Sequence, residues 1–185
     1  MFLVKYEFVV VFLFINFVNI DITFAKCRLN VPAMQNLQLK RMSGLWYPVE
    51  TDDPSVNARK GCDTFNVTYS NSVEKGESIT AFLTSNAKKY ERFTLYSVNG
   101  TGRLKIQNNG NRKIADLIDG WLISSDYVNY SMWYVCNENS KDPGYKYIGL
   151  RERPPKMDIV KQISSMFISL GFDLTDLRSI NQMNC

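Results

Sequence analysis

The sequence predicts an all-β domain, a meander either closed into a barrel or folded as a sandwich, with one helix after its last strand. Short segments rich in β-branched and aromatic residues follow one another, and turn signals such as Asn99-Gly100 and Asp119-Gly120 separate them. This regular spacing is typical of antiparallel barrels and sandwiches. The expected strands are Gly44–Glu50, Cys62–Ser70, Ser78–Ser85, Arg92–Val98, Gly102–Gln107, a stretch that ends at Asp126, Tyr130–Cys136 and Tyr145–Arg151. Arg112–Ile118 fits either a further strand or a long loop.

One segment near the end of the chain has helical periodicity instead. Pro154-Pro155 can start a helix, and Gly171 supplies its stop. Between them, apolar residues recur at steps of three and four, which predicts that one face of the helix packs on the sheet. These residues are Val160, Ile163, Phe167 and Leu170.

Length and composition suit one water-soluble domain. The chain has 185 residues, of which 22% are charged, with a mean hydropathy of -0.21. It has no histidine, so most hydrolase triads, zinc sites and histidine-ligated haem sites are excluded, and we expect neither an enzyme nor a metal site. The basic pairs Arg59-Lys60, Lys88-Lys89 and Arg112-Lys113 are too scattered to indicate nucleic-acid binding.

The first 25 residues read as a secretory signal. Lys5 precedes an apolar run, Phe8–Val18, and small residues suitable for cleavage lie at Thr23 and Ala25. The run is too short for an ordinary membrane-spanning helix, so a retained anchor is the weaker alternative and no stable membrane insertion is expected. Cleavage after Ala25 would leave a secreted, extracellular domain of residues 26–185.

The cysteines and acceptor sequons fit the same compartment. Four widely spaced cysteines, Cys27, Cys62, Cys136 and Cys185, predict two disulfides, although the sequence alone allows three pairings. Three Asn-x-Ser/Thr sequons could carry glycans or could occur by chance. They begin at Asn66, Asn99 and Asn129.

Three motifs in order resemble those of the lipocalin family, across nearly the whole mature chain. Gly44-Leu45-Trp46 resembles the family's G-x-W signature, and Ser125-Asp126-Tyr127 with Tyr130 is similar to its T-D-Y-x-x-Y motif. Arg151 and Arg153 both qualify as the arginine that ends the last barrel strand. The pattern is most similar to that of bilin-binding and apolipoprotein D-like arthropod lipocalins.

This resemblance implies an eight-stranded antiparallel up-and-down barrel with one open mouth and the helix on its flank. Trp46 would close one end of the barrel, and Arg151 or Arg153 would lie across its indole ring. A cation stacked on an indole covers a large area in a fixed geometry. Gly44, Asp126 and Tyr127 would be structural, with Asp126 bonding to turn amides. The resemblance also implies the pairings Cys27–Cys136 and Cys62–Cys185.

Side chains alternate along a strand, so a cysteine that faces outward predicts which of its neighbours face the cavity. Cys136 outward puts Trp133 and Val135 inside, and Cys62 outward puts Asn66 in water. A β-bulge would invert such an assignment. The expected cavity lining is Phe65, Val67, Tyr69, Leu122, Trp133, Val135, Tyr145 and Tyr147.

An aromatic and aliphatic lining with several hydroxyls predicts an extracellular carrier of a flat or elongated apolar ligand. A bilin such as biliverdin, a fatty acid, a retinoid or a sterol would fit, each as cargo rather than as a cofactor. Binding of an amine would need a carboxylate in the pocket; Glu50 and Asp63 are candidates, although an exposed loop position is the simpler expectation for both.

The alternative is a secreted salivary-type lipocalin that binds a host or receptor protein, such as a protease, or scavenges a small mediator. The acidic turn Glu50–Asp53 and the loop Asn108–Lys113 could serve such a surface, although solvated connections explain both more simply. The identity of the ligand and the oligomeric state stay open at this point.

Overall fold

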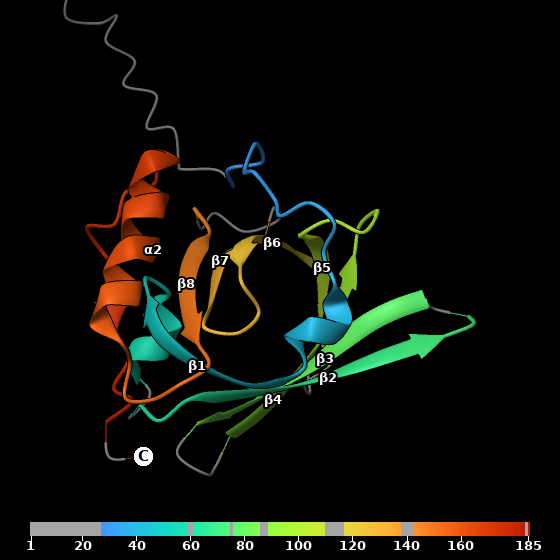
Figure 1. The fold of residues 1–185 in the computed structure, drawn as a ribbon, viewed down its shortest axis with the longest axis horizontal. Helices are drawn as coiled ribbons and strands as arrows, with labels where there is room; N and C mark the ends of the chain where they lie inside the picture. The colour runs from blue at the N-terminus through green and yellow to red at the C-terminus, as the bar shows by residue number, and fades with distance from the viewer. Residues whose placement is uncertain are drawn as a thin grey trace, which may run out of the picture.

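The computed structural model of the chain describes residues 27–58, 61–74, 76–85, 89–109, 117–137, 143–183 and 185. In this part of the chain, eight antiparallel strands form a closed barrel with one helix outside it (Figure 1). Neighbours follow chain order from β2 to β8, and β1 closes the circuit by pairing with both β8 and β2. The strands are β1 Gly44–Thr51, β2 Thr64–Ser72, β3 Gly76–Ser85, β4 Lys89–Ser97, β5 Arg103–Asn108, β6 Leu117–Ser125, β7 Tyr130–Cys136 and β8 Tyr145–Leu150.

This closed circuit decides between the two folds that the sequence allows. A closed ring of paired strands is a barrel, so the predicted eight-stranded up-and-down barrel is confirmed and the sandwich is wrong. Leu117 and Ile118, from the ambiguous segment, begin β6. Residues 110–116 and the predicted signal segment lie outside the described residues. A short strand that the sequence did not predict, β9 (Arg178–Ser179), pairs with β1.

Alternate connections of an up-and-down barrel lie at opposite ends. The 3-10 helix η2 (Leu39–Met42) and the connections after β2, β4 and β6 lie at one end, which we call the closed end. Strands β1, β3, β5 and β7 end at the other end of the barrel, the open end, where the 3-10 helix η3 (Pro54–Ala58) follows β1.

Alternation along the strands divides the apolar side chains into two clusters. One cluster fills the barrel and includes Trp46 and Leu122. The other lies between the outer face of the barrel and the helix, and includes Trp121, Tyr134 and Ile148. Adjacent residues such as Trp121 and Leu122 thus belong to different clusters, as the period of two requires.

The helix α2 (Met157–Ser169) lies along the outside of the barrel beside β8 (Figure 1). Val160, Ile163 and Phe167 are its buried residues, as the apolar stripe predicts. Gly171, at φ +75°, ends the helix, and its N–H donates to Ile168 O at 2.8 Å. No helix among the described residues is long and apolar enough to cross a membrane.

Candidate ligand-binding site

Side chains that face the barrel interior differ in exposure between its two ends. In the half next to the closed end, Leu104 and Leu122 are 0% exposed and Val67 is 7% exposed, so this half is filled by packed side chains. In the half next to the open end, Leu83 and Thr51 are also buried. Seven other inward-facing side chains there are only partly buried. These are Phe65, Phe93, Ile118, Trp133, Val135, Tyr145 and Tyr147.

Four of the predicted lining residues form one continuous patch. Trp133 lies directly opposite Tyr147 across the β7–β8 ladder, and Val135 lies opposite Tyr145. Residues opposite one another on antiparallel strands share a face, so all four present their side chains to the interior. This patch, Trp133, Val135, Tyr145 and Tyr147, is called the mouth patch below.

The other predicted lining residues are spread along the barrel. Phe65 lies near the open end, whereas Val67 and Leu122 belong to the packed half. Tyr69 lies toward the β2–β3 hairpin at the closed end, where its hydroxyl donates to Glu77 Oε1 at 2.6 Å. The sequence did not distinguish these depths, because alternation gives the face of a residue and not its height in the barrel.

The connection after β1 is tied to β8 at the mouth. Tyr147 Oη donates to Asp53 Oδ2, and the Lys146 N–H donates to Asp52 Oδ1 at 2.6 Å. The Lys146 ammonium also pairs with the Asp52 carboxylate. These contacts hold η3 and its flanking residues beside the mouth patch.

Glu91 is an inward-facing carboxylate that the sequence analysis missed. It lies on β4 opposite Leu83, two residues before Phe93, which packs against the interior cluster. Alternation along β4 from the buried Leu95 would have placed it inside. Glu91 therefore puts an acidic group on the interior face near the open end.

At the closed end, Trp46 and Arg151 form the seal that the family resemblance implies. The indole of Trp46 is 4% exposed, and its Nε1 donates to Met42 O at 2.8 Å. The Arg151 guanidinium lies 3.7 Å from the centre of the Trp46 ring. A Cβ at position 44, where φ is +104°, would lie 3.0 Å from Arg151 Nη1, so Gly44 leaves room for this stack.

Arg151 also joins three segments of the chain through its hydrogen bonds. Its Nε donates to Tyr127 O at 3.1 Å, Nη1 to Leu45 O at 3.0 Å and Nη2 to Arg41 O at 3.0 Å. The Arg41 guanidinium in turn covers the Tyr127 ring at 4.4 Å. The closed end is therefore built from two cations stacked on two aromatic rings.

Arg153 does not take part in this seal, although the sequence offered it as an equal candidate. Strand β8 ends at Leu150, so the alternation that would put Arg153 on the face of Arg151 no longer applies. Arg153 instead lies 4.4 Å from the ring of Tyr47, which faces outward opposite Leu150. The structure thus assigns the closing role to Arg151.

Asp126 organises the turn between β6 and β7. Its Oδ1 accepts N–H bonds from Val128, Asn129 and Tyr130 at 3.0, 2.7 and 3.1 Å. Burial alone would raise the pKa of Asp126, but these bonds and one from the Asn129 side chain outweigh burial and lower it.

We expect Asp126→Asn to lower the free energy of unfolding by about 1 kcal/mol at pH 7, because amide N–H groups bond less strongly to a neutral acceptor. A lowered folded-state pKa stabilises the fold above the unfolded value, and this contribution is lost as the pH falls through the folded value. Urea unfolding from pH 2 to 6 should show the difference between wild type and variant shrinking toward acid pH. A difference that is constant with pH would contradict this role.

The structure contains the two disulfides Cys27–Cys136 and Cys62–Cys185. Cys136 lies in the cluster outside the barrel, while Trp133 and Val135 pack against the interior cluster. Cys136 therefore faces outward while Trp133 and Val135 face the interior, as strand alternation predicts.

Two carboxylates lie elsewhere than the sequence suggested. Glu50 is neither in the cavity nor in an exposed loop, because a bulge between Pro48 and Glu50 turns it onto the outer face opposite Ile148. Asp63, directly before β2, is 0% exposed and so is not an exposed loop residue either.

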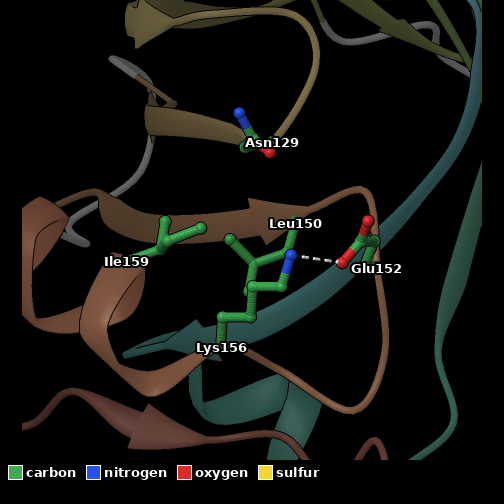
Figure 2. Close-up of a pocket in the computed structure, with 5 residues that line it drawn as sticks. All are labelled: Asn129, Leu150, Glu152, Lys156 and Ile159. Carbon is green, nitrogen blue, oxygen red and sulfur yellow. Dashed lines mark ion pairs between the residues drawn. The ribbon is translucent and has the colours of Figure 1, made fainter.

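The sequon asparagines Asn66, Asn99 and Asn129 are all exposed. Asn66 faces water from β2, as the strand alternation predicts. Figure 2 shows Asn129 beside a crevice between the end of β8 and α2, across which Lys156 pairs with Glu152 at 2.7 Å. The crevice has a volume of about 10 Å³, room for no more than a single water molecule.

Comparison with protein-family models and with curated proteins gives no match. Solved structures do match. The amine-binding protein of Rhodnius prolixus, in its tryptamine complex, is 18% identical, covers 83% of this chain and 85% of its own, and has a TM-score of 0.62. Insecticyanin from the tobacco hornworm Manduca sexta is 17% identical, with 86% and 88% covered and a TM-score of 0.65.

The allergen Per a 4 from cockroaches is 16% identical, with 87% and 98% covered and a TM-score of 0.62. Identities this low establish a shared fold. The barrel order, the outer helix and the Trp46–Arg151 seal agree with these likenesses and with the sequence motifs. The chain therefore has the lipocalin fold, in the form seen in these arthropod proteins.

Proposed function

We propose that the protein is a carrier that binds one small apolar ligand in the open half of the barrel. The difference in side-chain burial between the two halves of the barrel supports this proposal: the closed half is packed, whereas the mouth patch is partly accessible to solvent. These apolar side chains line a concave surface and remain in contact with water. A ligand that covers them is stabilised by about 25 cal/mol for each Å² of apolar area removed from water.

The side chains present suit a flat or elongated ligand with few polar groups. Trp133 and Val135 offer apolar contact, while Tyr145 and Tyr147 add hydroxyls near the opening. A bilin, fatty acid, retinoid or sterol fits this description, held as cargo and without chemical change. An aromatic amine, such as the tryptamine in the Rhodnius prolixus structure, joins these candidates because Glu91 would lie beside a cationic end.

We place this carrier outside the cell. The two disulfides need an oxidising compartment to persist, and the three sequon asparagines are accessible to glycosylation. Residues 1–25 would direct the chain there and then be removed.

The alternative of a protein partner finds little support in the acidic turn that the sequence offered for it. Glu50 faces the region between β1 and α2, Asp52 pairs with Lys146, and Asp53 accepts a bond from Tyr147. Asp52 and Asp53 are therefore engaged within the fold, and Glu50 lies away from the barrel mouth. Most of the second candidate surface, Asn108–Lys113, lies outside the described residues.

Trp133→Ala should weaken binding of the apolar dye N-phenyl-1-naphthylamine by about tenfold, because it removes a large ring from the mouth patch. The matched control is Tyr96→Ala, which removes a half-buried ring from the opposite face of the barrel wall. Titration followed by dye fluorescence should give an unchanged dissociation constant for the control. Equal dissociation constants for Trp133→Ala and wild type, with both proteins folded by circular dichroism, would contradict binding inside the barrel.

A further inference from the structure

A cavity lies outside the barrel, between β1, the start of α2 and the C-terminal segment of residues 178–183. Its volume is about 490 Å³, which is within the range of small-molecule sites. It is separated from the interior by the barrel wall itself. Its lining includes Glu50, Pro154, Met157, Val160, Ile180 and Met183.

The β-bulge in β1 is the reason that a carboxylate reaches this cavity. Pro48 pairs with Gly149 and Glu50 pairs with Ile148, so Val49 is the extra residue. Strict alternation from the inward Trp46 would turn Glu50 into the barrel. The bulge instead turns both Val49 and Glu50 onto the outer face, as bulges beside functional sites often do.

Glu50 is a partly buried acid that forms no ion pair with any of the described residues. Burial raises the pKa of Glu50 and outweighs the lowering effect of the neighbouring hydroxyl groups of Ser164 and Ser179. Among the described residues no lysine or arginine lies within ion-pair distance of it. The cations on the segments that adjoin the cavity have other partners. Lys156 pairs with Glu152, and Arg178 donates to Asp52 O. Arg153 lies over the Tyr47 ring and donates to Gln182 Oε1 at 3.5 Å.

The wall formed by the C-terminal segment is fixed in place. The Ile180 N–H donates to Val49 O at 2.8 Å, and Gln182 Nε2 donates to Pro48 O at 2.8 Å and to Asp63 O at 2.9 Å. The disulfide from Cys185 holds the end of this segment. The cavity therefore exists before any ligand arrives, which reduces the entropic cost of binding.

The rim of the cavity is apolar and adaptable. Met157 is 50% exposed and Met183 is 55% exposed, and both line this cavity. Methionine adjusts its shape to an apolar partner more readily than branched side chains do. A cavity lined by one partly buried acid and two exposed methionines is complementary to a molecule with one positive charge and an apolar body.

We propose that this outer pocket binds a small organic cation, with its ammonium group on the Glu50 carboxylate and its apolar body between Met157 and Met183. This site is distinct from the barrel interior and is additional to the proposed carrier function. Its ligand class is a primary ammonium on a compact apolar group.

The test uses the mature protein labelled with ¹³C at its methionine methyl groups. Titration with phenethylammonium should shift the Met157 and Met183 signals, whereas the uncharged phenethyl alcohol should shift them weakly. Glu50→Gln should weaken the phenethylammonium response by about tenfold or more, because a charge-assisted bond is lost. Glu74→Gln, an exposed acid in the β2–β3 turn, should leave the response unchanged.

The signal of Met132, which is 0% exposed, checks that Glu50→Gln keeps the wild-type fold. Equal affinity in wild type and Glu50→Gln would overturn the proposal, as would equal responses to the ammonium and the alcohol. Shifts confined to Met34 and Met42, which contact the interior cluster, would place the cation in the barrel and also overturn it. The carrier proposal fails separately, through the Trp133→Ala titration.

Discussion

Replacing Trp46 with alanine should lower the free energy of unfolding by about 4 kcal/mol. The indole is 4% exposed, donates to Met42 O and lies under the Arg151 guanidinium, so its removal leaves a cavity and an unpaired carbonyl. It also removes the surface on which Arg151 is stacked, and Arg151 joins β1, η2 and the β6–β7 turn.

Urea unfolding followed by far-ultraviolet circular dichroism measures this loss. Tyr47→Ala is the matched control, since Tyr47 is the next residue of β1 but faces outward and is only half-buried; we expect a loss of about 1 kcal/mol. The loss of free energy of unfolding for Trp46→Phe should lie between the losses for Trp46→Ala and Tyr47→Ala, because phenylalanine keeps a ring beneath Arg151. Equal losses for Trp46→Ala and Tyr47→Ala would mean that the closed end does not depend on this stack.

Removing the Cys62–Cys185 disulfide by serine substitution at both positions should lower the free energy of unfolding by about 4 kcal/mol. The bridge joins residues 123 positions apart, so its loss restores a large conformational freedom to the unfolded chain. In the folded state it frees the C-terminal segment, which then keeps its place only through β9 and the Gln182 hydrogen bonds.

The Cys27–Cys136 bridge supplies the comparison. Its removal should cost a similar free energy of unfolding, because it spans 109 positions, but should leave the C-terminal segment in place. Carboxypeptidase digestion under native conditions should therefore shorten only the variant that lacks Cys62–Cys185. Equal digestion of both variants would show that this bridge does not hold the segment against β1.

Local patterns in the sequence were sufficient for most of the architecture. Turn signals and β-rich segments gave the strands, and the stripe through Val160, Ile163 and Phe167 gave the buried face of α2. Patterns of this kind depend on neighbours in the chain and so can be read without coordinates. The seal at the closed end was expected only from the resemblance to the lipocalin motifs, which left Arg151 and Arg153 as equal candidates until the structure placed Arg151 over Trp46.

The features that the sequence missed depend on contacts between distant segments. The bulge at Val49 reverses the face of Glu50. Pro48 was a local signal for it, since proline within a strand is typical of bulges and edges, but the strand alternation was applied without it. Strand β9 has only two residues and forms because the C-terminal segment is held against β1. The hydrogen bonds of Asp52 and Asp53 with β8 join residues 94 positions apart. Because such partners cannot be identified from the sequence, the acidic turn was expected to be a solvent-exposed connection.

Binding of an apolar ligand in the open half of the barrel can be measured on protein secreted from eukaryotic cells. The purified protein is extracted with organic solvent, and quantitative mass spectrometry gives the number of extracted molecules per protein chain. The Trp133→Ala variant is prepared and measured in the same way. We expect an apolar molecule at close to one per chain in the wild type and a clear reduction in the variant. An extract empty of apolar molecules, together with no dye binding by the extracted protein, would contradict this binding.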